Sequence, residues 1–157
     1  MGYAYFYESP IGKVLIGEEN SKITHVLLKG DSPQPEYVLK ETPVLAEAGR
    51  QLKEYFDGRR TEFDLELNPS GTEFMKKVWE ALLKIPYGET RSYKDIAMSI
   101  GRHKACRAVG MANNRNPIPI IIPCHRVIGA DGSLVGYGGG LDTKIFLLEL
   151  EKAHKPR

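Results

Sequence analysis

The cluster Cys124, His125 and Arg126 is the part of the sequence best suited to chemistry. It lies in the segment from Ile118 to Val127, an apolar run bounded by prolines that we expect to be a strand. A thiol is a weak nucleophile and a thiolate a strong one, and a neighbouring imidazole or guanidinium favours the thiolate. Adjacent residues of an extended segment point to opposite sides, so we expect a bridging water between Cys124 and His125. A lone cysteine is usually an inert buried residue, but these polar neighbours predict a nucleophile.

Neither a nucleotide site nor a metal site is expected elsewhere. Gly138, Gly139 and Gly140 precede an expected helix, but no Lys-Ser or Lys-Thr pair follows in the register that a phosphate-binding loop requires. The two cysteines and the four histidines, at positions 25, 103, 125 and 154, lack paired metal-ligand spacing. The chemistry is therefore expected to need no cofactor and no metal.

The composition indicates an intracellular protein. Two cysteines in 157 residues, without a recognisable signal peptide, indicate a reducing compartment in which both stay thiols. No apolar run approaches the roughly 20 residues of a membrane span, and the N-terminus MGYAYFYESP has no basic region and no apolar core. We expect a soluble, unprocessed, cytoplasmic protein, or a nuclear one in a eukaryote.

The charge is distributed unevenly along the chain. Residues 1–70 hold 8 Lys and Arg against 12 Asp and Glu, a net of −4, whereas residues 71–126 hold 10 against 4, a net of +6. Residues 127–157 are balanced. A basic segment beside an acidic one suits a polyanionic partner such as nucleic acid, although a solvated basic helix face would give the same counts.

The N-terminal part is expected to be a small mixed or antiparallel sheet with one helix. Four β-rich runs are separated by turns or by the helix: YAYFYES, KVLIGEE, ITHVLLKG and FDLELN. Apolar residues at helical spacing predict a helix over 43–56: Leu45, Ala48, Leu52 and Phe56. The turn-rich segment 68–71 coincides with the change of charge. We therefore expect a supporting domain over 1–68 and a boundary just after it.

The C-terminal domain, residues 71–157, is expected to be mostly helical, which makes the whole chain an α+β (α/β) protein. Gly71 or Thr72 would cap a helix running to about Lys84, and a last helix is expected over about 141–151.

Between these helices the sequence predicts a helix-turn-helix. Two helical patterns, over 93–100 and 104–114, are joined by Gly101-Arg102-His103. The second helix carries Lys104, Arg107 and four small residues that would let it approach a groove: Ala105, Ala108, Gly110 and Ala112. Small residues also permit tight helix packing, so this pattern alone leaves both interpretations open.

Several motifs accompany the segment Pro123-Cys124-His125-Arg126-Val127 in a fixed order. They are Pro86-Tyr87-Gly88-Glu89, Tyr93, Arg107-Ala108-Val109-Gly110, Asn116-Pro117, Gly139-Gly140-Leu141 with Lys144, and Glu151. In these motifs the chain resembles the O6-alkylguanine-DNA alkyltransferase family, the methylated-DNA-protein-cysteine S-methyltransferases. The resemblance covers about residues 71–151, while residues 1–68 fit only the general plan of the family.

The resemblance implies DNA repair by a single-turnover transfer of an alkyl group from O6-alkylguanine, and from O4-alkylthymine, to Cys124. His125 would be the base, linked to the thiol by a water, and Glu151 would orient the imidazole. Asn116 would hold two segments of the site together, and Tyr93 would donate a hydrogen bond to the leaving guanine. The base pocket would be lined by Val127, Tyr137 and Gly138.

The resemblance also implies a monomer that binds double-stranded DNA, with the second helix in the minor groove and the alkylated base flipped out of the stack. Arg107 would fill the gap left by the base. The residues facing DNA would be Arg107, Ser92, Lys104, Ala105, Cys106 and Gly110.

Two positions depart from the pattern of the family. Gly138 stands where the family often has Ser, a residue that helps to close the pocket, so no preference between methyl and bulky lesions is implied. Cys106 stands where a small residue such as Ala is common, and we interpret it as a packing residue.

Two other functions remain open at this point. A binding module that flips alkylguanine without repairing it would share the helix-turn-helix, but such proteins lack the reactive cysteine that is intact here. A thiol hydrolase would also need a cysteine, a histidine and an acid. Transfer of a methyl group to Cys124 would separate both from the alkyltransferase.

Overall fold

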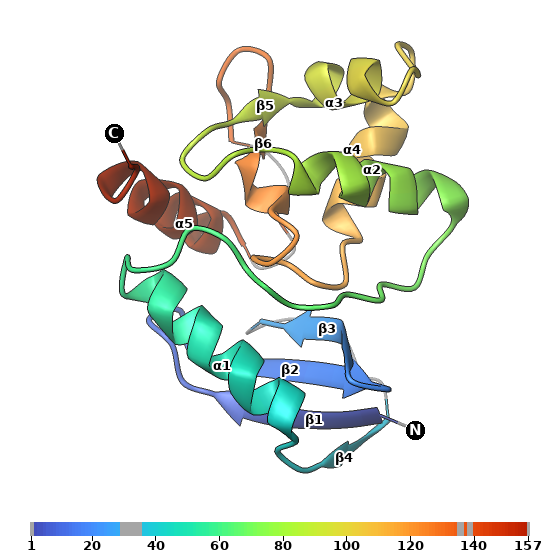
Figure 1. Ribbon diagram of the computed structural model, residues 1–157. Helices are drawn as coiled ribbons and strands as arrows, with labels where there is room; N and C mark the ends of the chain where they lie inside the picture. Colours follow the sequence, from blue (N-terminus) through green and yellow to red (C-terminus); the bar gives the residue numbers. More distant parts are fainter. Residues whose placement is uncertain (1, 29–35, 135–136, 138–139, 157) are drawn as a thin grey trace. The chain divides into compact units, whose positions relative to one another are not determined.

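The chain divides near Ser70 into two units, Met1–Ser70 and Gly71–Arg157 (Figure 1). The computed structural model describes residues 2–28, 36–134, 137 and 140–156. Each unit has a sheet of its own, with four strands in the first and two in the second. The expected α+β fold is confirmed, and the division falls within the turn-rich segment 68–71.

The first unit is built on a four-stranded mixed sheet. Its strands are β1 (Gly2–Tyr7), β2 (Val14–Glu19), β3 (Lys22–Leu27) and β4 (Tyr37–Leu39), in the order β3-β2-β1-β4. The first three form the expected antiparallel meander, and β4 adds to β1 in parallel. Asn20 and Ser21 have positive φ of 55° and 64°, as the tight turn between β2 and β3 requires. The sequence analysis missed β4, which is only three residues long.

Helix α1 (Pro43–Phe56) packs across one face of this sheet and has the predicted bounds. Thr42 caps its N-terminus, because its Oγ1 accepts a hydrogen bond from the Leu45 N–H. Pro43 stands at the first helical position, where a missing N–H costs nothing. Gly58, with a φ of 76°, follows the C-cap Asp57 and turns the chain away.

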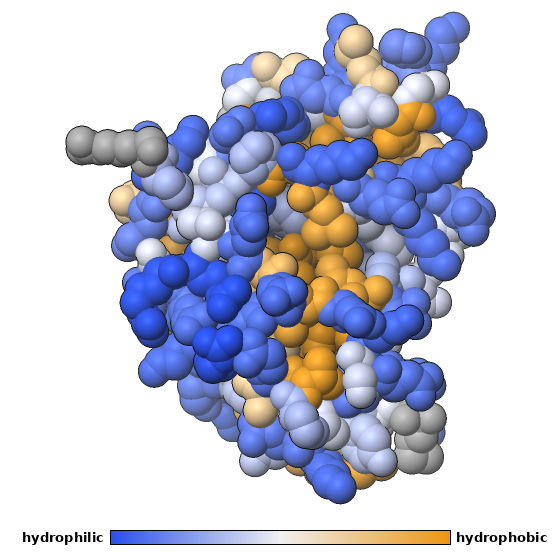
Figure 2. Space-filling view, viewed as in Figure 1, coloured by the Kyte–Doolittle hydropathy of each residue, from blue (hydrophilic) through white to orange (hydrophobic). Residues whose placement is uncertain are grey.

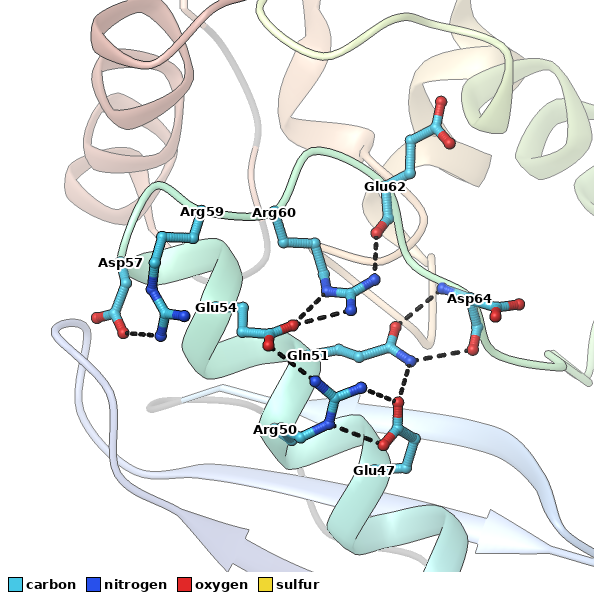
Figure 3. Close-up of polar contacts among 9 residues, drawn as sticks. All are labelled: Glu47, Arg50, Gln51, Glu54, Asp57, Arg59, Arg60, Glu62 and Asp64. Atoms are coloured by element: carbon cyan, nitrogen blue, oxygen red, sulfur yellow. Dashed lines mark hydrogen bonds and ion pairs between the residues drawn. The ribbon is translucent and has the colours of Figure 1, made fainter.

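The segment 63–68 is not the full strand that its alternation predicts. It makes one isolated bridge, between Leu67 and Ile23, with backbone hydrogen bonds on either side of it. Nearby, the side chain of Gln51 on α1 takes the place of a neighbouring strand. Its Nε2 donates to the Asp64 carbonyl (3.1 Å), and its Oε1 accepts from the Asp64 N–H (2.9 Å) (Figure 3). Backbone groups that would otherwise extend a ladder are thus satisfied by a side chain.

The same surface of α1 carries a chain of ion pairs (Figure 3). Arg50 bridges Glu47 (2.5 Å) and Glu54 (2.8 Å), and Arg60 also reaches Glu54 (2.8 Å). Hydrogen bonds from Arg50 lower the pKa of Glu47 to about 2. Exposed pairs of this kind add little stability, so we expect the network to contribute little to holding the segment after α1.

The second unit places helices around a very short parallel sheet. Its helices are α2 (Glu73–Leu83), α3 (Tyr93–Ser99), α4 (Cys106–Asn114) and α5 (Leu141–Ala153); its strands are β5 (Arg91–Ser92) and β6 (Val127–Ile128); and a 3₁₀ turn, η1, spans Cys124–Arg126. Thr72, one of the two caps that the sequence left open, caps α2. Trp79 of α2 is buried, and its Nε1 donates to the Ala112 carbonyl of α4 (2.9 Å). This contact fixes the helix-turn-helix to the scaffold.

None of the helices within the described residues is long and apolar enough to span a membrane. In Figure 2, hydrophilic side chains make up most of the surface drawn, with apolar side chains visible in smaller areas among them.

Candidate active site

The segment before Cys124 is a tight buried turn, and the strand expected there is absent from it. Ile120 has a φ of 74°, the Ile122 N–H donates to the Ile118 carbonyl (2.9 Å), and only an isolated bridge joins Pro119 to Ile122. Prolines lack the N–H that a strand ladder needs, which explains why this apolar run folds on itself. The Cys124 N–H donates to the Ile122 carbonyl (2.8 Å), and Cys124 begins η1. The extended geometry assumed for Cys124 and His125 is therefore wrong.

Two asparagines brace this turn. Asn116 donates from Nδ2 to the Ile122 carbonyl (2.8 Å), and its Oδ1 accepts from the Ile118 N–H (2.9 Å). Asn113, buried on α4, donates from Nδ2 to the Cys124 carbonyl (3.3 Å). The sequence analysis missed Asn113, although its position four residues after the buried Val109 was a signal that it faces the interior.

Buried within this unit, His125 of η1 and Glu151 of α5 form a hydrogen-bonded pair. His125 Nε2 lies 2.6 Å from Glu151 Oε2, and the side chains are 0% and 1% exposed. A carboxylate can only accept, so Nε2 carries the proton and Nδ1 presents a lone pair. Among the described residues, no protein group hydrogen-bonds to that Nδ1. Burial lowers the pKa of His125 against the opposing effect of Glu151, so the imidazole is neutral and able to act as a base.

Arg126 also binds the carboxylate of Glu151. Its Nε lies 2.8 Å from Oε1 and its Nη2 lies 3.0 Å from Oε2, while the Gly88 N–H donates to Oε1 (3.1 Å). Burial alone would raise the pKa of Glu151, but the hydrogen bonds and charges of His125 and Arg126 hold it below its usual range. The sequence analysis expected the guanidinium of Arg126 to favour the thiolate of Cys124, whereas in the structure it binds Glu151.

Tyr93 and Lys144 both interact electrostatically with Cys124, which is 4% exposed. Burial raises the pKa of Tyr93, and an ionised Cys124 raises it further. Burial lowers the pKa of Lys144, and an ionised Cys124 opposes that effect. The ammonium of Lys144 donates to the Val127 carbonyl (2.6 Å). The structure thus places a phenol and a buried cation near the thiol, and a neutral imidazole directly follows it in the sequence.

The three residues expected to line the base pocket differ in how deeply they are buried and in whether the structure describes them. Val127 is fully buried in β6, and Tyr137 is half-buried. Gly138 lies outside the described residues. Both cysteines are thiols, as expected. Within the described part of the chain, no three His, Cys, Asp or Glu side chains are grouped as a metal site.

The predicted helix-turn-helix is present as α3 and α4, with a longer connection than expected. Gly101, with a φ of 73°, ends α3, and the Ala105 N–H donates back to the Arg102 carbonyl (2.9 Å). Helix α4 therefore begins at Cys106, so Lys104 and Ala105 belong to the connection, contrary to the sequence-based bounds. Ser92 caps α3 through a reciprocal pair of hydrogen bonds with Asp95.

The residues of α4 divide between two faces. Arg107, Ala108 and Met111 are exposed, whereas Ala112 is buried against the scaffold and does not belong to the small outward face proposed from the sequence. Gly110 is half-buried beside Tyr93, where a Cβ would lie 3.7 Å from the ring. Lys104 is exposed, and Ala105 and Cys106 are half-buried.

Both units match known domains. Residues 2–69 match the ribonuclease-like domain of 6-O-methylguanine DNA methyltransferase, and residues 73–153 match its DNA binding domain. The chain is also 54% identical over 153 residues to the methylated-DNA–protein-cysteine methyltransferase of Methanosarcina barkeri, covering 96% of this chain and 97% of that protein. The chain belongs to the 6-O-methylguanine DNA methyltransferase family. The match over 2–69 is more specific than the general likeness that the sequence analysis gave to this part.

Solved structures of family members have the same fold. The Mycobacterium tuberculosis protein OGT in complex with DNA has a TM-score of 0.92 and 48% identity, with 98% of this chain and 95% of that chain covered. The O6-methylguanine DNA methyltransferase of Methanococcus jannaschii has a TM-score of 0.71 and 31% identity, with 97% and 95% covered. Both matches span the two units of this family member.

Proposed function

We propose that this family member repairs DNA by moving an alkyl group from O6 of guanine, and from O4 of thymine, to the sulfur of Cys124. The observation that carries the proposal is the buried pair of His125 and Glu151: His125 directly follows Cys124 in the sequence, and its bond to Glu151 leaves Nδ1 available as a base. The names of the methylated-DNA–protein-cysteine methyltransferases at 54% identity support the same activity.

The transfer is a displacement at carbon. Nδ1 of His125 takes the thiol proton through a water, and Glu151 stabilises the imidazolium that forms. The thiolate of Cys124 attacks the alkyl carbon, a sulfur–carbon bond forms, and the carbon–oxygen bond breaks with its electron pair passing to the guanine. Tyr93 donates a hydrogen bond to the departing base, which eases the loss of a purine anion. Asn116 and Asn113 hold the turn that presents the thiol.

DNA would bind along α3 and α4. Arg107 and Lys104 are exposed on this pair, which suits contacts to phosphates and to the minor groove. The alkylated atom lies within the base stack, so the nucleotide must be flipped to reach a thiol that is 4% exposed. Arg107 would occupy the resulting gap. The other residues expected to face DNA on this pair are Ser92, Ala105, Cys106 and Gly110. The base pocket would be lined by Val127, Tyr137 and Gly138. The first unit would support this arrangement.

The reaction is expected to occur once per molecule. A thioether is a poor leaving group, and the only other cysteine, Cys106, begins α4, whereas Cys124 begins η1. We expect a monomer to suffice, because all the residues proposed for transfer come from one unit of one chain. Sedimentation of the protein with and without duplex DNA would test this.

Mass spectrometry after incubation with duplex DNA containing O6-methylguanine tests the proposal directly. We expect one methyl group on the peptide containing Cys124, in a yield that never exceeds one per molecule. Cys124→Ser should keep DNA binding and lose the transfer. DNA binding without a labelled peptide would instead indicate a module that recognises lesions without repairing them, and turnover of a fluorogenic ester or peptide would indicate a thiol hydrolase.

A further inference from the structure

Arg126 makes several buried contacts around the pair of His125 and Glu151, which we call the relay, and the proposed transfer gives it no role. Its guanidinium binds both oxygens of Glu151, and its Nη1 donates to the Ile85 carbonyl beyond the end of α2 (2.7 Å). The guanidinium also lies over the ring of Tyr87, 5.7 Å from its centre. Its side chain is 8% exposed. One buried side chain therefore joins α5, the end of α2 and the loop that follows it.

We propose that Arg126 is a positioning residue for alkyl transfer, which fixes the carboxylate of Glu151 toward His125 and balances its charge so that His125 rests as a neutral base. This inference rests on the proposed function, because it concerns the same relay. It assigns Arg126 no contact with the alkyl group or with the guanine.

The geometry of Glu151 leaves His125 a single arrangement. Oε1 accepts from Arg126 Nε and from the Gly88 N–H, while Oε2 accepts from Arg126 Nη2 and from His125 Nε2. A bidentate guanidinium holds the plane of a carboxylate, whereas a single hydrogen bond would let it rotate. The proton of His125 is thus kept on Nε2, and Nδ1 is kept as the nitrogen that can accept the thiol proton.

The charge of Arg126 acts together with burial to keep the imidazole neutral at rest. A buried carboxylate without a second partner would favour the imidazolium, and a histidine that is already protonated cannot act as a base. Arg126 already neutralises the negative charge of the Glu151 carboxylate, so His125 need not be protonated to do so. The titratable and charged groups around the pair are Cys124 and Arg126 from η1, Tyr87 from the loop, and Lys144 and Glu151 from α5.

These groups give two cations and one carboxylate, so a resting imidazolium would add a third positive charge to a buried site. The pKa of His125 is lowered from its ordinary value, in agreement with this count of charges. Burial lowers it most, the charges of Arg126 and Lys144 lower it further, and Glu151 alone opposes them. The imidazolium becomes favourable only when the thiolate of Cys124 forms at the same time.

The test compares R126Q with R126K, using single-turnover methyl transfer from duplex DNA across the pH range. In R126Q the charge is lost, so His125 should protonate at higher pH. We expect its rate to fall about tenfold or more between about pH 8.5 and pH 6.5, a range in which the wild-type rate stays nearly constant. R126K keeps the charge and loses the fork, so its rate should drop by a similar factor at every pH.

A merely structural role for Arg126 would lower the rate of both variants without moving the pH dependence of either. An R126Q profile parallel to that of the wild type would therefore overturn the proposal, and so would an R126K profile shifted like that of R126Q. These outcomes separate charge from geometry within one assay.

A measurement on the unmodified protein decides the matter if R126Q does not fold. Imidazole nitrogen shifts of His125, followed by NMR through a pH titration, should report a neutral ring with its proton on Nε2 at about pH 7. An imidazolium at that pH would refute the inference. The proposed function has its own test, and it fails if the wild-type protein never acquires a methyl group on Cys124. The NMR result does not depend on that outcome.

Discussion

The carboxylate of Glu151, near the end of α5, lies 2.6 Å from Nε2 of His125 in the 3₁₀ turn η1. The two residues are 26 positions apart in the sequence, and both are buried. This contact converts the C-terminal helix into part of the candidate active site. It also fixes which nitrogen of His125 binds the carboxylate and which one keeps a lone pair.

Glu151→Gln should slow transfer and weaken the fold together. An amide stabilises an imidazolium less than a carboxylate does, so the single-turnover rate should fall by about 10²–10⁴-fold. The same change leaves Arg126 as a buried cation without its counter-charge, which costs about 3–5 kcal/mol. Rapid-quench kinetics and urea denaturation would measure the two effects. Glu149→Gln, an exposed neighbour on the same helix, is the matched control and should change neither.

The free energy of unfolding should decrease on acidification, and His125 should contribute part of this decrease. Its folded pKa is lowered below its ordinary value of 6.5, so below about pH 6.5 the unfolded chain binds a proton that the folded protein excludes. The free energy of unfolding therefore falls as the pH drops below 6.5. Glu151, whose folded pKa is depressed, adds a second loss in more acidic solution, as the pH falls below the ordinary carboxyl range.

Urea denaturation at a series of pH values would measure this dependence. His25, whose pKa burial also lowers, contributes with the same sign from the first unit, so the comparison must be made with a variant. His125→Gln should lose part of the decrease just below pH 6.5 and keep the more acidic one. If the variant and the wild type have the same slope, His125 is not the group responsible.

Arg107→Ala should impair repair of duplex DNA more than reaction with a free alkylated base. If Arg107 fills the gap left by a flipped nucleotide, its loss affects only substrates that must be flipped, by about tenfold or more. Competition between methylated duplex and free O6-alkylguanine for Cys124 would measure this ratio. Arg115→Ala, which removes the same charge at the other end of α4, is the control. Equal losses with both substrates would exclude the flipping role.

Gln51→Ala should destabilise the first unit without touching the candidate active site. Gln51 is 2% exposed, and its amide satisfies both backbone groups of Asp64, so we expect a loss of about 1–3 kcal/mol in the free energy of unfolding. Arg50→Ala, on the exposed ion-pair network beside it, should have no measurable effect (Figure 3). Similar losses from both variants would indicate that the network, and not the amide, holds the segment after α1.

Local sequence patterns were sufficient where one element depends mainly on its own residues. The apolar spacing within Pro43–Phe56, with Thr42 and Asp57-Gly58 at its ends, set the bounds of α1 because capping and periodicity act within a few residues. The same holds for the meander of β1 to β3. Patterns failed where a distant partner decides the outcome, as at residues 63–68, where Gln51 replaces a strand neighbour.

For the candidate site, the sequence by itself determined the chemistry available: the thiol of Cys124, the imidazole after it, and the motifs that place the chain in its family. Only the tertiary structure decided the geometry. Residues 118–123 form a turn because buried side chains and two prolines leave no partners for a ladder, and Asn113 faces Cys124 because α4 packs with that side inward. The fork of Arg126 on Glu151 was likewise invisible in the sequence. Residues 25 positions apart acquire a shared charge balance only when folding brings them into contact and removes the water around them.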